Sequence, residues 1–483
     1  MKYFVLHNLK KTTFVQQMLK QKHTYGTIAR NLLRWKNNLR NKSLVGQDID
    51  DEKFRNNLME YNIQRQLGYD PTVCHVPMRS LYFGFGGIVT ACCFNRHYEL
   101  GRFPENTIEE IINGEKRKLL QQHLDKTDFS LGCKFCKDMI YSGDYMSVGA
   151  RFADIFPPQG AMPSEMVFEL DNTCNLRCKM CNAKFSSAHD EGRRTVAPYD
   201  NEDFINQLKP FVPHLVETKF LGGEPFLSDI YPKIWELIIE LNPKCKIRVQ
   251  SNGTILNDKL KDILKRGNFQ IGLSIDTLNP ERYATIRNGA KIEKTLVNLE
   301  FFNQISRKNG ENMSISVCPM KENRFDIPEL VKFCNDNDIF IYFNDVSNEG
   351  YTLGELSEQE LDELATFYKG SAPKANNSIS RYNGKVFSNL IRKVEYLKEC
   401  AVRKRYKDEK IPYTRIELER KITEIMSENP NFRYDNAIFL RIPEKFNVKR
   451  RIINGMNIQQ LTSFFEMSAE EQSKFINDNF SNK

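Results

Sequence analysis

Three cysteines in one short run constrain this chain more than any other feature of its sequence. Cys174, Cys178 and Cys181 have the spacing Cys-x3-Cys-x2-Cys, which supplies three thiolates from one loop and no fourth. An iron–sulfur cubane held by three cysteines keeps one iron free to bind a substrate or a cofactor. Structural zinc sites instead prefer four closed ligands, commonly in paired Cys-x2-Cys knuckles. The spacing therefore indicates reactive metal chemistry.

The residues around these cysteines resemble the signature of the radical S-adenosylmethionine (SAM) superfamily. Residues 166–170 form a short apolar, β-prone run that can deliver the loop at the end of a strand. In this superfamily the cysteine loop follows the first strand of a partial (β/α)6 barrel. The resemblance implies that the three cysteines hold a 4Fe-4S cluster that binds SAM.

Motifs at later strand ends extend the resemblance over roughly residues 164–346. Gly222, Gly223, Glu224 and Pro225 match the superfamily element that holds the SAM amino group, where glycine allows the backbone to approach a ligand. The other cofactor contacts that the resemblance implies are Ser251 and Asn252 for the ribose, Ser274 and Asp276 at the fourth strand end, and Arg287 for the SAM carboxylate.

Strand-like and helical patterns alternate through this region. Amphipathic helices are predicted over 230–241 and 327–337, and the fifth and sixth strands over 313–318 and 339–345. Alternating strands and helices predict a parallel α/β barrel with ligands at the C-terminal strand ends. We therefore expect an α/β fold in which a partial (β/α)6 radical SAM barrel follows an N-terminal α+β auxiliary-cluster domain. A helical C-terminal region is expected over residues 350–483.

A second set of cysteines lies upstream of the barrel. Cys74, Gly87 and Cys92 form Cys-x12-Gly-x4-Cys, and Cys133 and Cys136 follow as Cys-x2-Cys. The pattern resembles the shortened SPASM auxiliary domain, called a twitch domain, which binds one additional 4Fe-4S cluster. This domain is expected over residues 71–156, although such domains normally follow the barrel. Residues 81–83 and 88–90 predict a hairpin within it, and residues 108–112 a helix before the second cysteine pair.

Two questions about this second set remain open from the sequence. Cys92 and Cys93 are adjacent, and the Gly-x4-Cys spacing favours Cys92 as the ligand. A four-cysteine zinc ribbon would need the same ligands as an iron–sulfur cluster. Ser142 occupies the next ligand position of a full SPASM domain, so a second auxiliary cluster is not expected.

Composition and charge exclude several classes of protein. No apolar run approaches the length of a membrane span or a signal-peptide core. Seven of the twelve cysteines fall into metal-ligand patterns, so we expect a reducing cytoplasm rather than a disulfide framework. Residues 1–47, within a helical arm predicted over 1–70, contain ten Lys or Arg and no acidic residue. Contact with an anionic membrane surface or nucleic acid is one interpretation, but a helix packed on the protein body is favoured.

The resemblance implies reductive cleavage of SAM to a 5′-deoxyadenosyl radical that abstracts hydrogen from a substrate C–H bond. The implied cofactors are two 4Fe-4S clusters and SAM, with a reductant such as flavodoxin or ferredoxin. The auxiliary domain favours a peptide or protein substrate, with cross-linking, dehydrogenation or epimerisation as outcomes. Chemistry on a small metabolite, such as a nucleotide-linked sugar or lipid precursor, and a non-catalytic iron–sulfur scaffold are the alternatives. Cys318 is the candidate hydrogen donor, although a buried cysteine is more often a small hydrophobe.

Overall fold

The computed structural model describes residues 52–65, 70, 72–156, 159–160, 162–189, 195–196, 198–346 and 348–408. The chain divides into a larger compact unit, which extends to Tyr351 and includes Pro373–Phe387, and a smaller unit formed by Thr352–Ala372 and the residues from Ser388 onward. The basic segment 1–47 and the predicted helical region after residue 408 lie outside the described residues.

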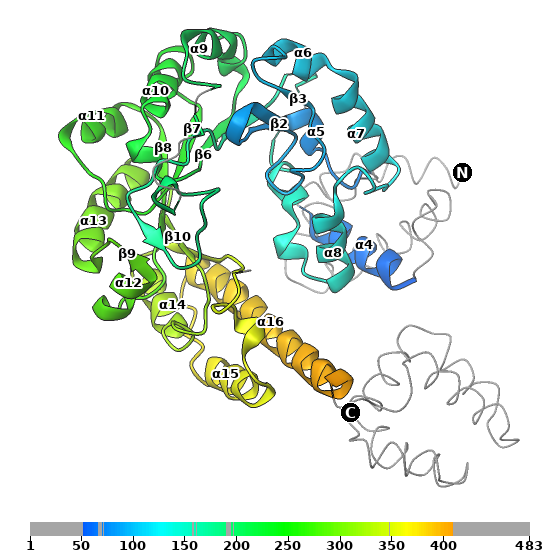
Figure 1. Ribbon diagram of the computed structural model, residues 1–483, viewed down its shortest axis with the longest axis vertical. Coiled ribbons are helices and arrows are strands. Elements are labelled where there is room, and N and C mark those ends of the chain that lie inside the picture. Colours follow the sequence, from blue (N-terminus) through cyan, green and yellow to red (C-terminus); the bar gives the residue numbers. More distant parts are fainter. Residues whose placement is uncertain are drawn as a thin grey trace, which may run out of the picture. The chain divides into compact units, whose positions relative to one another are not determined.

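A nine-stranded sheet with the order β11-β10-β8-β7-β6-β4-β1-β2-β3 organises the larger unit (Figure 1). From β4 to β11 the strands are parallel and neighbours follow one another in chain order, which confirms the predicted barrel architecture. The first, fifth and sixth of these strands lie within two residues of the predicted positions, and the six are β4 (Glu165–Phe168), β6 (Glu217–Phe220), β7 (Lys246–Ser251), β8 (Phe269–Ser274), β10 (Ser314–Val317) and β11 (Phe340–Phe343).

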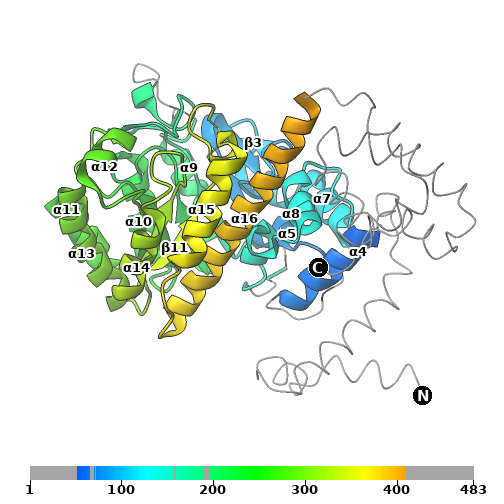
Figure 2. The same ribbon diagram turned by 90° about the horizontal axis from the view of Figure 1, so that it is seen from below.

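Helices between these strands cover one face of the sheet (Figures 1 and 2). The apolar side chains of that face pack on them: Phe168 and Phe220 stack with centroids 5.0 Å apart, and Trp235 meets Phe220 edge-on at 5.5 Å. The helices are α9 (Glu202–Leu208), α10 (Ile230–Leu241), α11 (Asp258–Arg266), α12 (Pro280–Ile286), α13 (Ile292–Lys308) and α14 (Ile327–Asp336). Asparagine side chains cap the N-termini of α9, α11 and α12 by accepting a backbone N–H.

The opposite face of the same strands is polar. Along β7, Lys246, Arg248 and Gln250 alternate with buried apolar or small residues. A filled (β/α)8 barrel places layers of branched apolar side chains on its inner face. The inner face of this partial barrel is instead charged, which is the character of a ligand-binding surface.

The N-terminal elements continue the barrel sheet. β1 (Ser80–Phe83) pairs in parallel with β4 and antiparallel with β2 (Ile88–Thr90), and β2 pairs with β3 (Gly101–Arg102). The predicted hairpin is thus confirmed, and it joins the auxiliary region to the barrel by backbone hydrogen bonds. Phe83 stacks on Phe168 across this junction, with centroids 5.4 Å apart.

Short helices complete the auxiliary region. α6 (Ile108–Asn113), the predicted helix, begins with a capping box made by Thr107 and Glu110. The others are α4 (Glu52–Gln64), α5 (Val76–Arg79), α7 (Glu115–Asp125) and α8 (Lys134–Ser142), with 3-10 turns η1 (Phe85–Gly87), η2 (Tyr145–Ser147) and η3 (Gly149–Phe152).

A single side chain covers the free edge of the barrel sheet at β11. Asn383, near the start of α16 (Ser378–Asp408), accepts the Ile341 N–H at 3.0 Å and donates to the Ile339 carbonyl at 2.9 Å. This amide replaces a neighbouring strand and blunts an edge that would otherwise pair with another chain.

The smaller unit is helical in its described part. It contains η7 (Leu353–Glu355), α15 (Glu358–Gly370), whose capping box begins at Ser357, and the later turns of α16. Among the described residues, none of the helices has the length and apolar character needed to cross a membrane.

Candidate functional site

The three cysteines of the first motif lie on the loop after β4, at the C-terminal end of the parallel strands. β5 (Arg177–Cys178) pairs with β9 (Arg287–Asn288), which places Cys178 opposite Arg287. At the other end of the loop, the Cys174 N–H donates to Ser187 Oγ at 3.3 Å. Each of the three thiols lies within electrostatic range of at least one other. The loop therefore holds the three sulfurs in one region.

Burial dominates the ionisation of these thiols. It raises the pKa of all three, that of Cys181 to about 11. For Cys178 the guanidinium of Arg287 opposes this effect, since Nη1 lies 3.9 Å from the sulfur. A metal deprotonates a coordinating thiol outright. Buried thiols beside a fixed cation are therefore suited to ligate a cluster.

The glycine pair after β6 packs directly on this loop. A Cβ at Gly222 would lie 2.3 Å from the Asp171 carbonyl oxygen, and one at Gly223 would lie 2.3 Å from that of Thr173. The Glu224 N–H donates to the same Thr173 oxygen at 2.7 Å. The sequence attributed these glycines to the approach of a ligand, but the first neighbour that excludes a side chain here is the backbone of the cysteine loop.

Glu224 connects the end of β6 to the end of β7. Its buried carboxylate accepts Ser251 Oγ–H at 2.8 Å and the Asn252 N–H at 2.7 Å. Burial raises the pKa of Glu224 to about 7, although these hydrogen bonds act to lower it. Pro225 begins the 3-10 turn η6 (Pro225–Leu227) that follows. Three of the predicted SAM contacts are thus in direct contact with one another.

Two polar residues that the sequence did not single out tie this region to the cysteine loop. Asn252 Nδ2 donates to Asn175 Oδ1 at 2.9 Å, and Asn175 Nδ2 donates to Thr254 Oγ1 at 2.9 Å. Asn175 and Thr254 are single polar residues in loops and fit no spacing pattern. Only their proximity in space reveals that they position the loop.

The ends of β8 and β10 contribute a buried ion pair. Arg287 Nε lies 2.8 Å from Asp276 Oδ2, and Asp276 Oδ1 accepts the Cys318 N–H at 2.7 Å. Cys318 is partly exposed and within electrostatic range of Cys178, and burial raises the pKa of its thiol to about 12. Ser274 Oγ accepts Gln250 Nε2–H at 2.9 Å on the inner face. Cys318 therefore lies beside the predicted site, and its role as a donor stays a prediction.

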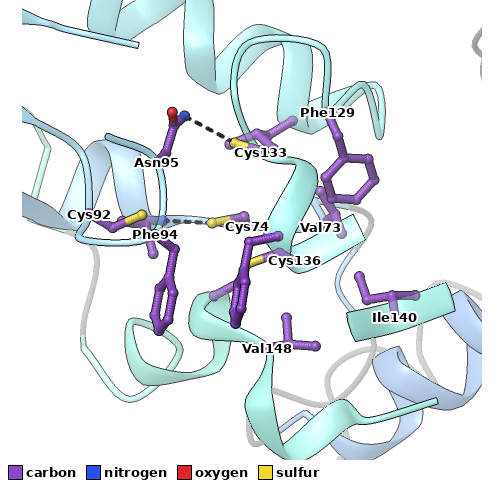
Figure 3. Close-up of a pocket in the computed structure, with 14 residues that line it drawn as sticks. Val73, Cys74, Cys92, Phe94, Asn95, Phe129, Cys133, Cys136, Ile140 and Val148 are labelled. Atoms are coloured by element: carbon purple, nitrogen blue, oxygen red, sulfur yellow. Dashed lines mark hydrogen bonds between the residues drawn. The ribbon is translucent and has the colours of Figure 1, made fainter. Parts of the chain in front are cut away.

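A second thiol set lines a cavity in the auxiliary region. Figure 3 shows the sulfurs of Cys74, Cys92, Cys133 and Cys136 gathered in one place, with Phe94 beside them. Phe94 and Phe135 stack with centroids 4.7 Å apart and also line the cavity. Within the described residues no three His, Cys, Asp or Glu side chains converge closely enough for one metal ion. The four thiols therefore line one cavity, where they could ligate a shared group.

The adjacent cysteines of this region lie in different surroundings. Cys92 lines the cavity and interacts electrostatically with Cys74 and Cys136. Cys93 does not line it; burial raises the pKa of its thiol to about 11, and its charged neighbours include Arg96 and Lys219. This geometry supports the sequence-based preference for Cys92 as the ligand.

Comparison with protein families decides the identity of the barrel region. Residues 169–334 match the model of the radical SAM superfamily. This chain carries a radical SAM domain. Residues 74–138 match the model of the SPASM iron–sulfur cluster-binding domain. The radical SAM domain implies a 4Fe-4S cluster and SAM, and the SPASM domain implies an auxiliary iron–sulfur cluster.

The similar proteins have low sequence identity to this chain and match only part of its length. A GTP 3′,8-cyclase of Limosilactobacillus fermentum is 22% identical over 230 residues, which are 44% of this chain and 68% of the relative. A probable GTP 3′,8-cyclase of Methanocaldococcus jannaschii is 25% identical over 167 residues, 35% of this chain and 53% of the relative. The chain thus spans between half and about two thirds of these relatives.

Solved structures with similarity to the chain include Streptococcus suis SuiB bound to S-adenosylmethionine and anSMEcpe with bound AdoMet. Each is 20% identical with a TM-score of 0.34. The match to SuiB covers 51% of this chain and 61% of SuiB; that to anSMEcpe covers 43% and 58%.

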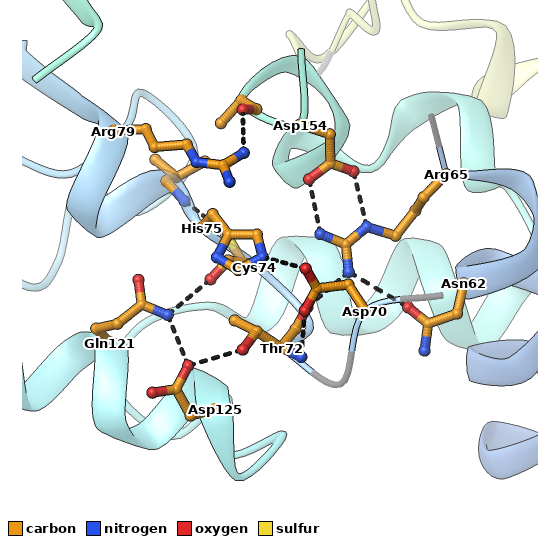
Figure 4. Close-up of polar contacts among 12 residues, drawn as sticks. Asn62, Arg65, Asp70, Thr72, Cys74, His75, Arg79, Gln121, Asp125 and Asp154 are labelled. Atoms are coloured by element: carbon orange, nitrogen blue, oxygen red, sulfur yellow. Dashed lines mark hydrogen bonds and ion pairs between the residues drawn. The ribbon is translucent and has the colours of Figure 1, made fainter. Parts of the chain in front are cut away.

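Polar contacts around Cys74 hold the SPASM domain's first cysteine in place (Figure 4). Arg65 forms a bidentate pair with Asp154 at 2.7 and 2.6 Å, and its Nη1 donates to the Thr72 carbonyl at 2.6 Å. Gln121 Nε2 donates to the Cys74 carbonyl at 3.1 Å. Both members of the ion pair are fully buried, so the pair fixes the segment that carries Cys74.

The SPASM domain also supplies a donor to a sulfur. Asn95 Nδ2 lies 3.3 Å from the Cys133 sulfur and 2.7 Å from the Leu131 carbonyl. Hydrogen bonds to cluster sulfurs are one determinant of reduction potential. The cavity, its four thiols and this amide together fit an iron–sulfur cluster.

Proposed function

We propose that this chain cleaves SAM reductively and removes hydrogen from a C–H bond of a substrate. The observation that carries the proposal is the convergence of the cysteine loop, the Gly222–Gly223 pair and the Asp276–Arg287 pair at one end of the parallel strands. These three features lie far apart in the sequence and belong to different strand ends. A site of this kind serves a cofactor that touches several strand ends at once.

The residues have separable roles in this proposal. Cys174, Cys178 and Cys181 ligate the cluster. When bound, the cluster supplies the electron that cleaves SAM to methionine and a 5′-deoxyadenosyl radical. The Gly222–Gly223 backbone and Glu224 bind the SAM ammonium, because the Glu224 carboxylate is positioned by hydrogen bonds from two neighbouring groups. The remaining contacts are Ser251 and Asn252 for the ribose, Arg287 for the carboxylate, and Ser274 and Asp276 as supports of the strand end.

The auxiliary cluster and the substrate form the finer part of the proposal. Cys74, Cys92, Cys133 and Cys136 would hold the auxiliary cluster, which would supply a site for electron exchange with the substrate. The SPASM match supports a peptide or protein as the substrate. The second candidate is a small metabolite, favoured by the relatives named GTP 3′,8-cyclase and by the charged inner face of the barrel. A reductant such as flavodoxin or ferredoxin would supply electrons.

One assay tests the reaction without knowledge of the substrate. The chain is reconstituted anaerobically with iron and sulfide, reduced with dithionite and incubated with SAM. We expect release of 5′-deoxyadenosine, and Cys178→Ala should abolish it. Intact clusters in the wild type with no 5′-deoxyadenosine would leave only the scaffold alternative. Once a substrate is known, full product formation by Cys318→Ala would remove Cys318 as the hydrogen donor.

A further inference from the structure

The inner face of the barrel sheet carries a connected network of charges. Lys219 on β6 and Arg248 on β7 are register neighbours, and Glu165 and Glu217 pair with each other one row nearer the strand starts. Lys219 Nζ lies 2.5 Å from Glu165 and 3.4 Å from Glu217, and Arg248 Nε lies 2.7 Å from Glu217. None of these residues belongs to the SAM site described above.

A third cation joins this face from the SPASM domain. Arg96 Nη2 lies 2.9 Å from Glu169, which follows β4, and Tyr82 also donates a hydrogen bond to Glu169. The Arg96 guanidinium lies over the Tyr82 ring, 5.2 Å from its centroid. Cys93 is within electrostatic range of both Arg96 and Lys219, and the acids that these cations contact, Glu169 and Glu165, lie four residues apart at β4.

The network is layered, with carboxylates beneath and cations above. The side chains of Glu165, Glu217 and Glu169 are 7%, 4% and 8% exposed. Those of Lys219, Arg248 and Arg96 are 25%, 36% and 32% exposed. The buried acids therefore hold the cations in place, while the accessible surface presents N–H donors.

Several of these donors have no protein acceptor. Among the described residues, Arg248 contacts an acid only through Nε, so both of its Nη groups are available. Arg96 uses Nε on the Cys93 carbonyl and Nη2 on Glu169, which leaves Nη1. Guanidinium groups with free planar donors match the geometry of carboxylates and phosphates.

The amine of Lys219 also keeps its charge. Burial alone would lower its pKa, but Glu165 and Glu217 raise that pKa above its ordinary value. The aromatic ring of Phe152 lies 5.6 Å from the ammonium and favours the cation further. The inner face thus presents three cations whose charges are balanced by three more deeply buried carboxylates.

We propose that Lys219, Arg248 and Arg96 bind a compact anionic group of the substrate, either a phosphate or a carboxylate. This inference rests on the proposed function, because it names a feature of the substrate from which hydrogen is removed. Lys219 lies on β6 and precedes Gly222, in the loop after that strand, by three residues, which is at most roughly 10 Å at about 3.3 Å per residue of extended chain. The anionic group therefore anchors the substrate below the SAM site and determines which substrates are accepted.

Direct binding of simple anions tests this inference. The full chain, reconstituted with both clusters and loaded with SAM so that the open iron is occupied, is titrated by calorimetry with inorganic pyrophosphate and with glutarate. We expect at least one of them to bind, and Arg248→Gln to raise its Kd tenfold or more. Preference for pyrophosphate identifies a phosphate as the group, and preference for glutarate identifies a carboxylate. Failure of both anions to bind the wild type overturns the inference.

The matched control is Arg266→Gln on α11. Arg266 is also ion-paired, to Glu236 at 2.5 Å, and is 42% exposed, but it lies on an outer helix. Its substitution should leave the Kd within twofold. Arg96→Gln provides a second test if Arg248→Gln fails to fold, as judged by circular dichroism and iron content. Unchanged anion affinity in folded Arg248→Gln or Arg96→Gln overturns the inference.

The proposed function can fail independently of this inference. Anion binding without 5′-deoxyadenosine release from SAM refutes the enzyme and leaves the anion-binding face intact. Release of 5′-deoxyadenosine without anion binding refutes only the anionic substrate.

Discussion

The guanidinium of Arg287 lies 2.8 Å from the carboxylate of Asp276, and the two side chains are 7% and 0% exposed. Asp276 also accepts the Cys318 N–H, and Arg287 reaches the sulfur of Cys178. This pair therefore connects the fourth strand end and the fifth strand end to the cysteine loop. Removal of one member leaves the other as a buried, unpaired charge.

Arg287→Met should lower the free energy of unfolding by about 3–5 kcal/mol, because the buried carboxyl of Asp276 loses the cation that offsets its burial. The double variant Arg287→Met/Asp276→Asn should lose clearly less, since asparagine is neutral and still accepts the Cys318 N–H. Denaturant unfolding of the reconstituted chain measures both. An equal loss in the single and double variants would show that the charge is not the cause.

The adjacent cysteines of the SPASM domain make a matched pair for metal analysis. With two cubanes the wild type should hold about eight irons per chain. Cys92→Ala should reduce this to about four, since Cys92 lines the thiol cavity, and Cys93→Ala should leave it near eight. The iron, sulfide and zinc content per chain is measured for the wild type and both variants. A wild type with about four irons and one zinc would instead support the zinc ribbon.

SAM affinity should depend on pH through Glu224, whose pKa is about 7. The ionised fraction of this carboxylate falls from about nine tenths at pH 8 to about one tenth at pH 6. If the ionised form binds the SAM ammonium, the Kd for SAM should rise roughly tenfold over that interval. Glu224→Gln should bind weakly and show no such dependence between pH 6 and 8. A pH-independent wild type would exclude this role of Glu224.

The raised pKa of Glu224 also makes the free energy of unfolding depend on pH. Because the pKa is raised in the folded state, Glu224 favours folding when protonated, and this contribution is lost as pH rises through 7. In the absence of SAM, Glu224→Gln should therefore reduce the decrease in stability between pH 5 and pH 8, measured by denaturant unfolding.

Gly223→Ala should displace the cysteine loop, because its Cβ would lie 2.3 Å from the Thr173 carbonyl oxygen and 2.4 Å from that of Asn172. We expect loss of the SAM-binding cluster, with about four irons retained in the SPASM domain, and no release of 5′-deoxyadenosine. Gly384→Ala on α16 is the control, since its Cβ meets no atom within 4 Å. It should keep all iron and gain up to about 1 kcal/mol of stability. Full iron in Gly223→Ala would contradict the packing argument.

Periodicity in the sequence was enough to predict three barrel strands and two barrel helices, α10 and α14. The runs that form β4, β10 and β11 are short and alternate with amphipathic helices. The two cysteine patterns were equally readable, because metal-ligating spacings are local in the chain. The preference for Cys92 over Cys93 also came from a local spacing.

Contacts between distant segments were not readable from any local pattern. Asn175, Asn95 and the Arg65–Asp154 pair support the two thiol sets, yet each is an ordinary polar residue in its own segment. No local pattern in the sequence marks the charged residues on β6 and β7 as members of one network. Their role depends on which face of the sheet the helices cover.

The sequence alone determined the type of chemistry, because three thiolates within eight residues and a glycine pair at a strand end are local requirements of a cluster and its cofactor. The tertiary structure decided how the SPASM domain is joined to the barrel and which charged groups the inner face of the sheet carries. β1 pairs with β4 although 81 residues separate the end of one from the start of the other, and three buried acids from two segments hold Lys219, Arg248 and Arg96. Such arrangements arise from strand pairing and burial, which act between residues that no sequence spacing connects.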